Sequence, residues 1–117
     1  MVRPLRLLVC AVIILAFNVA APSASAEARS CKPVVNPYAG SRYEGTDLSR
    51  IRARNVSCTT ARRVARGAHF KALGTPPPVS GVRQFRWRRW NITGDLSGRT
   101  DTYTAKSRGG KRISWMF

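Results

Sequence analysis

The alternation of apolar and polar positions is clearest between residues 56 and 73, where it predicts one amphipathic helix. Small or apolar residues recur there at intervals of three and four, which is the spacing of one face of an α-helix. Ser57 is the expected N-cap and Gly74 the expected C-cap. Because the stripe is mostly alanine, the helix is expected to lie close to a flat partner such as a sheet. Its members are Cys58, Ala61, Val64, Ala65, Ala68, Ala72 and Leu73.

The last third of the chain alternates with the period of two that is typical of strands. In residues 84–93, Phe85 and Trp87 share one face, whereas Trp90 and Ile92 have the opposite parity. This reversal predicts a bulge near residues 88–89 or a strand that exposes Trp90. Residues 100–105 and 111–117 are two further strands, joined by a hairpin turn at 107–110. About three antiparallel strands packed on one helix make a two-layer α+β domain.

The segments before and after the helix are less regular. Residues 48–55 alternate arginines with Ile51 and Ala53, which favours a short strand, with helix as the alternative. Residues 27–43 form a strap that contains two prolines, and Tyr38 or Tyr43 is expected to lie over the core. Residues 74–81 are a proline-rich, semi-rigid connector.

The N-terminus has the features of a secretory signal peptide. Arg3 and Arg6 precede an apolar run at 7–17, and small residues at Ala24 and Ala26 suit cleavage after Ala26. The run is too short for a spanning helix, although an uncleaved anchor is the alternative. The predicted organisation is a leader over 1–26 and one secreted domain over 27–117. The domain is divided into an N-terminal region at 27–55 that includes the strap, the helix at 56–73, the connector at 74–81 and a β meander at 82–117.

Cysteine usage predicts one disulfide in the exported chain. Of three cysteines, Cys10 leaves with the leader, so Cys31 and Cys58 remain. An even pair in an exported protein is usually bridged, and two free thiols are the alternative. Their spacing excludes a CxxC redox or zinc motif.

The chain is strongly basic, with a formal charge of +16 that becomes +14 without Arg3 and Arg6. Such a charge favours anionic partners, and arginine forms bidentate contacts with phosphate, carboxylate or sulfate. We expect a basic patch on the outer helix face. For the aromatic run at 85–90, the favoured interpretation is a strand with Phe85 and Trp87 in the core and its arginines in water, and Trp90 is the best candidate for an exposed functional aromatic. The alternative is that the rings of this run are stacking surfaces for an anionic partner. The candidate anion-binding residues are Arg62, Arg63, Arg66, Arg86, Arg88, Arg89 and Trp90.

The residues offer little for catalysis or for metal binding. His69 is the only histidine, so no second imidazole is present for a metal pair, and it is expected at the rim of the helix. A nucleophile elbow and a phosphate loop are both missing from the sequence. We therefore predict no enzymatic activity, no cofactor, no metal and no small-molecule substrate, and expect a monomer.

Three stretches resemble a group of small secreted cationic proteins of actinobacteria without assigned function. They are Cys31, the run Arg-Ile-Arg-Ala-Arg-Asn-Val-Ser-Cys-Thr-Thr-Ala-Arg-Arg-Val-Ala at 50–65, and Gly-Gly-Lys-Arg-Ile-Ser-Trp-Met-Phe at 109–117. The resemblance implies a helix bridged through its first-turn cysteine and packed on an antiparallel meander. Many such proteins carry a second cysteine pair on the sheet, which this chain lacks, with Ala105 at one of the two places. The resemblance implies no catalytic residues.

Three functions follow as hypotheses. The leading one is a secreted, non-enzymatic protein that binds anionic extracellular polymers, nucleic acid or acidic membrane surfaces through its basic patches. The alternative is a protein-interaction module, such as an inhibitor or an envelope accessory factor, that uses Trp90 or the three prolines at 76–78. An antimicrobial, membrane-active role is third.

Overall fold

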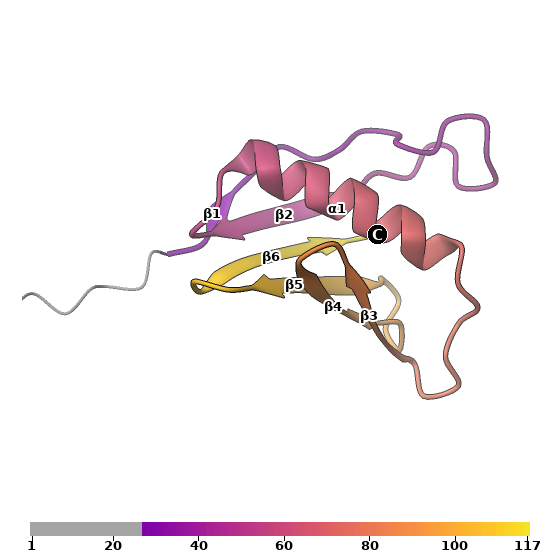
Figure 1. Cartoon of the computed structure of the whole chain (residues 1–117). Coiled ribbons are helices and arrows are strands. Elements are labelled where there is room, and N and C mark those ends of the chain that lie inside the picture. Colours follow the sequence, from indigo (N-terminus) through magenta and orange to yellow (C-terminus); the bar gives the residue numbers. More distant parts are fainter. Residues whose placement is uncertain (1–26) are drawn as a thin grey trace, which may run out of the picture.

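The computed structural model describes residues 27–117, which contain one helix and six strands (Figure 1). The predicted leader lies outside the described residues. The order along the chain is β1 (Arg29–Ser30), β2 (Ser49–Arg54), α1 (Cys58–Leu73), β3 (Val82–Trp87), β4 (Trp90–Asp95), β5 (Thr102–Ser107) and β6 (Lys111–Met116).

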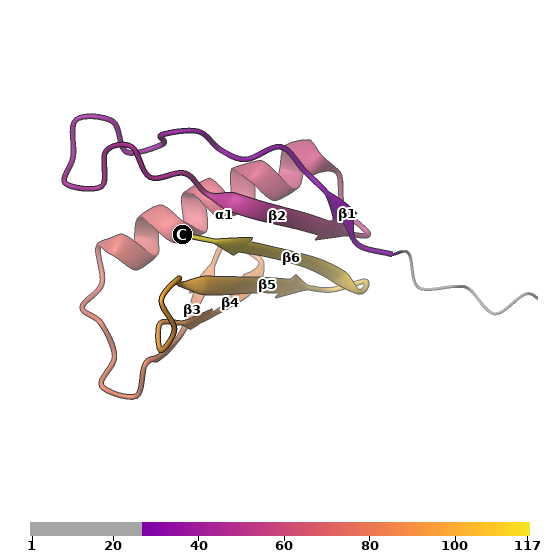
Figure 2. The same cartoon turned by 180° about the vertical axis from the view of Figure 1, so that it is seen from behind.

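The strands form a single antiparallel sheet in the order β1-β2-β6-β5-β4-β3 (Figure 2). The predicted α+β class is confirmed, but the expected number of about three strands is wrong. The segment before the helix adds β1 and β2 to the meander, because β2 pairs with β6 in register Ala53 to Ile113. The run at 84–93 supplies two strands instead of one.

The reversal of parity at residues 88–89 is a hairpin turn, not the expected bulge. Arg88 has a φ of 53°, in the left-handed region that tight hairpin turns require. Trp87 and Trp90 are directly opposite each other across this turn. A two-residue turn places both rings on the same face, although their positions differ by an odd number.

Local signals explain both ends of the helix. Ser57 accepts a hydrogen bond from the amide of Thr60, as expected of the N-cap. Gly74 is the C-cap with a φ of −81°, so its left-handed freedom is not used. Instead, the buried guanidinium of Arg83 on β3 donates hydrogen bonds to the carbonyls of Ala72 and Thr75. A cation there also complements the negative end of the helix dipole.

The core lies between the helix and one face of the sheet. The alanines of the predicted stripe are fully buried and bring the helix close to the strands. Gly67 allows the closest approach, because a Cβ there would overlap the indole of Trp87. Gly94 similarly makes room for the Tyr103 ring, which stacks on Trp115 with centroids 5.4 Å apart.

Two contacts attach the N-terminal part of the strap to the rest of the domain. The disulfide between Cys31 and Cys58 is confirmed, with Cα atoms 5.4 Å apart. Further along, Val34 and Leu48 form an antiparallel bridge. Tyr38 is buried and lies over the core, as expected of a strap tyrosine.

His69 is fully buried, so its predicted place at the rim of the helix is wrong. Its Nδ1 shares a 2.6 Å hydrogen bond with the hydroxyl of Tyr38, and its ring lies against Tyr103 and Phe117. Burial lowers the pKa of His69 to about 4, and the positive charge of Arg83 adds to this effect. The imidazole is therefore neutral at pH 7 and acts as a core residue with one polar contact.

Candidate anion-binding groove

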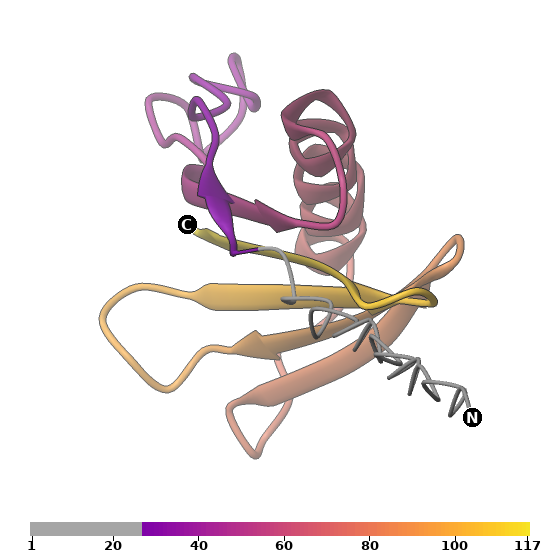
Figure 3. The ribbon, with the colours of Figure 1, turned by 90° about the vertical axis from the view of Figure 1, so that its left-hand side faces the viewer.

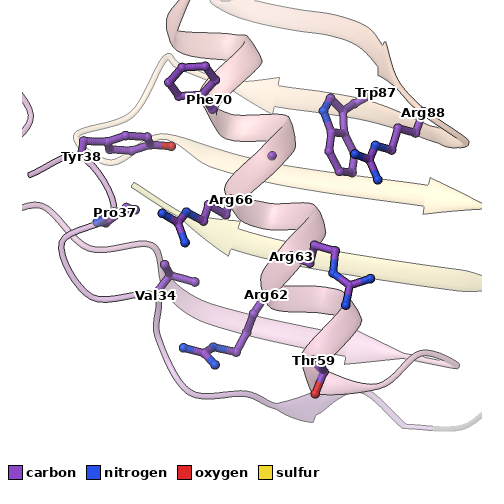
Figure 4. Close-up of a pocket in the computed structure, with 11 residues that line it drawn as sticks. Val34, Pro37, Tyr38, Thr59, Arg62, Arg63, Arg66, Phe70, Trp87 and Arg88 are labelled. Carbon is purple, nitrogen blue, oxygen red and sulfur yellow. The ribbon is translucent and has the colours of Figure 1, made fainter.

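An open groove of about 610 Å³ runs over the outer face of α1 (Figure 4). The strap forms one wall, and the β3–β4 hairpin forms the other. The lining residues are Val34, Pro37, Tyr38, Thr59, Arg62, Arg63, Arg66, Gly67, Phe70, Trp87 and Arg88. We call this feature the helix groove.

Four guanidinium groups line the helix groove. Arg62, Arg63 and Arg66 are exposed because the apolar stripe of α1 packs on the sheet and leaves the opposite side of the helix in solvent. Arg88 reaches the same groove from the hairpin turn. None of the lining residues is acidic. The groove therefore has a strongly positive potential that favours anionic groups.

Aromatic rings contribute to both walls of the groove. Trp87 is half-buried, and the guanidinium of Arg88 lies 4.7 Å from the centre of a Trp87 ring. Phe70 is 69% exposed and stacks on Tyr38, with ring centroids 6.5 Å apart. Burial raises the pKa of Tyr38, while nearby Arg66 acts in the opposite direction. The Tyr38 hydroxyl is therefore neutral at physiological pH, and it adds no negative charge to the groove.

Specific contacts hold the two walls at a fixed distance from the helix. Arg62 donates to the carbonyl of Pro33 at 3.3 Å, which ties the helix to the strap. Lys71 donates to the carbonyl of Arg86 at 2.6 Å, which ties it to the hairpin strand. The disulfide adds a covalent link at the first helical turn. The groove is thus preformed by the fold.

The structure gathers only part of the predicted set. Arg62, Arg63, Arg66 and Arg88 line the helix groove, but Arg86 and Arg89 do not. Those two lie in a separate hollow of about 710 Å³, lined also by Asn91, Ser107, Arg108 and Lys111.

The expectation of an exposed Trp90 is wrong, because only 8% of this residue is accessible. The hairpin places it beside Trp87 on the covered face of the sheet. Trp87, expected in the core, packs against it and is also the tryptophan that reaches the groove.

Tyr38, Phe70 and Trp87 are the functional candidates that sequence reasoning missed. Phe70 had a usable signal, because it is a large apolar residue on the polar side of the helix pattern. Tyr38 and Trp87 had none, since their positions depend on the path of the strap and on the hairpin register.

The remaining chemistry within residues 27–117 is sparse. The structure groups no three His, Cys, Asp or Glu side chains there in a way that would hold a metal ion. The described helix is neither long enough nor apolar enough to cross a membrane.

Comparison with known proteins adds no relative: no family model, no curated protein and no solved structure matches this chain. The function is therefore inferred from the geometry of the chain's own residues.

Proposed function

We propose that this protein is a secreted, non-enzymatic binding protein that holds a segment of an anionic polymer in the helix groove. The observation that carries the proposal is that four arginines from two elements line one groove, which has no acidic lining residue. Secretion itself rests on the leader predicted from residues 1–26.

The shape of the groove favours a polymer over a small anion. Its cations are spread along successive turns of α1 and across to the hairpin, and they do not converge on one point (Figure 4). A chain with repeated anionic groups contacts several guanidinium groups at once, and each contact releases counterions. Trp87 and Phe70 add apolar surface on which rings or hydrocarbon portions of such a chain can pack.

The test measures affinity for a labelled single-stranded oligonucleotide, used as a model polyanion, over a range of salt concentrations. The variant Arg63→Gln/Arg66→Gln/Arg88→Gln removes three groove charges and leaves the structural contact of Arg62 intact. We expect the salt dependence of log K to become shallower by roughly 2, following a slope of about −0.7 per contact for single strands.

The matched control, Lys32→Gln/Arg42→Gln/Arg99→Gln, removes the same charge from exposed positions outside the groove. Equal losses in the two triple variants would mean that net charge alone binds the probe. Salt-insensitive behaviour, with no affinity for DNA, heparin or anionic vesicles, would overturn the proposal. Capture of one defined protein from culture medium in place of polymer would favour the interaction-module alternative.

A further inference from the structure

The face of the sheet opposite the helix is uncovered by any other element within residues 27–117 (Figure 3). Strand register assigns every aromatic residue of the sheet to the helix side, because Phe85, Trp87, Trp90, Tyr103 and Trp115 alternate with exposed or half-exposed neighbours. The uncovered face therefore presents polar side chains almost throughout, and we call it the open face.

Cations form one row across the open face. The register pairs Arg86 with Asn91, Asn91 with Lys106, Lys106 with Arg112 and Arg112 with Arg54. Neighbouring strands lie about 4.8 Å apart, so this row extends roughly 19 Å across five strands. Four of its five members carry a positive charge.

Hydroxyl and amide groups form the next row along the strands. Here the register pairs Gln84 with Thr93, Thr93 with Thr104, Thr104 with Ser114 and Ser114 with Arg52. Side chains two positions apart on a strand lie on the same face, so the two rows run side by side. The open face thus offers a line of cations next to a line of four neutral hydrogen-bonding groups that ends at Arg52.

Folding does not explain the cation row. Lys106 faces Arg112, and Arg112 faces Arg54, in direct cross-strand pairs. Like charges in such pairs destabilise a sheet. In addition, the Nε of Arg54 is buried without a hydrogen-bond partner among the described residues. Arg54 lines a hollow of about 400 Å³ together with Arg52, Arg112, Ser114, Glu27 and Ala28, so one carboxylate stands at this end of the row.

We propose that the open face is a second binding surface, which takes an acidic polysaccharide of the uronic acid type running across the strands. Carboxylates of the polymer lie on the cation row, and ring hydroxyls lie on the row of Gln84, Thr93, Thr104 and Ser114. A pyranose ring is about as long as the distance between neighbouring strands, so successive sugars meet successive strands.

The chemistry of the open face favours this polymer over other anions. Bases of a nucleic acid need rings on which to stack, and the face has none in the described chain. Insertion into a membrane needs large apolar groups, whereas the two apolar residues Val82 and Met116 lie in a third row beside Asp95 and Thr102. Polyphosphate would use the cations but leave the hydroxyl row without ligands.

The experiment measures binding of the domain to polygalacturonate, with inorganic polyphosphate as the comparison ligand. The variant Lys106→Gln/Arg112→Gln should lower the affinity for both ligands by about tenfold, because two central contacts are lost. The variant Thr93→Val/Thr104→Val keeps branched strand residues but removes two hydroxyls, and should weaken polygalacturonate binding several-fold while leaving polyphosphate binding unchanged.

Each outcome separates this proposal from the one for the helix groove. The triple groove variant at Arg63, Arg66 and Arg88 should retain polygalacturonate affinity within about twofold, the scale of a long-range charge effect screened by salt. If that variant abolishes polygalacturonate binding and the two open-face variants do not, the open face is not the site, although the groove still is. Equal weakening of both ligands in the threonine variant would remove the assignment to a sugar polymer. Because the lysine–arginine variant relieves like-charge pairs, its melting temperature should not fall, and a loss of folding would contradict the proposal.

Discussion

The two faces of the sheet are built from the same strands and differ in every property that matters for stability. On the helix side, Ile113 and Trp115 are almost completely buried, whereas their chain neighbours Arg112 and Ser114 face the other way and are at least partly accessible. One face carries all the sheet aromatics, and the other carries a row of like charges that opposes folding. The comparison indicates that the covered face stabilises the domain, while the open face is available for binding at some cost in stability.

The largest expected effect on stability comes from removing the indole ring of Trp115 from the covered face. Trp115→Ala should lower the free energy of unfolding by about 3–5 kcal/mol, because it leaves a large cavity under the helix. Urea unfolding measures the change. Ser114→Ala, one residue away on the open face, should change stability by about 0.5 kcal/mol or less. Comparable losses in both variants would contradict the division between the faces.

Next in size is the effect of removing the disulfide, which links the helix to the strap. Cys31→Ser/Cys58→Ser should cost about 3 kcal/mol, since the cross-link closes a 27-residue separation in the unfolded chain. Thermal melting measures the change, and hydrogen exchange at Val34 and Leu48 should accelerate as the strap loosens. An unchanged melting temperature would mean that packing alone holds the helix on the sheet.

Acid should weaken the covered face through His69. The pKa of His69 is about 4 in the folded protein and near 6.5 when unfolded, so the unfolded chain binds more protons between these values. Stability is therefore fully present above pH 6.5 and falls as the pH drops toward 4, by up to about 3 kcal/mol. Chemical unfolding at several pH values measures this slope. His69→Gln should flatten it, and an unchanged slope in that variant would assign the effect to other groups.

The smallest effect should have the opposite sign. Arg112→Gln removes a charge that faces both Lys106 and Arg54, and should raise stability by about 0.2–1 kcal/mol. Ile113→Val, at the adjacent position on the covered face, should lower it by about 0.5–1.5 kcal/mol. Urea unfolding of the two variants shows whether neighbouring residues of one strand have opposite effects on stability. A destabilised Arg112→Gln would mean that the cation row supports the fold.

Local patterns were sufficient to predict the helix, its N-cap, the disulfide and the α+β class. The alanine stripe, Ser57 and the two cysteines act through neighbours in sequence or through simple pairing rules, so they can be identified without the fold. The strand number was wrong for two reasons. β1 and β2 join the sheet through the long-range pairing of β2 with β6, and the run at 84–93 has a parity that fits either a bulge or a tight hairpin. The hairpin is the form that lets the Trp87 indole pack against Gly67 of the helix.

The candidate sites were predictable only in part. Helical periodicity places Arg62, Arg63 and Arg66 on the outer face of the helix, and that face lines the groove. Burial of His69 was not predictable, because it depends on Tyr38, 31 residues away, closing over the ring. Of the cation row on the open face, only Arg86 was among the predicted anion-binding residues. The row as a whole was not predicted, since it joins five strands that are separated along the chain.

By itself, the sequence determined the charge of this protein, its helix and the alternation of its strands, because these depend on residue types and short spacings. Only the tertiary structure decided which cations stand together. Strand register aligned Arg86, Lys106, Arg112 and Arg54 on one side of the sheet, and the hairpin brought Arg88 and Trp87 to the arginines of the helix. The physical reason is that register and packing act between distant segments, where burying the aromatic residues on one face leaves the charges to gather on the surfaces that remain.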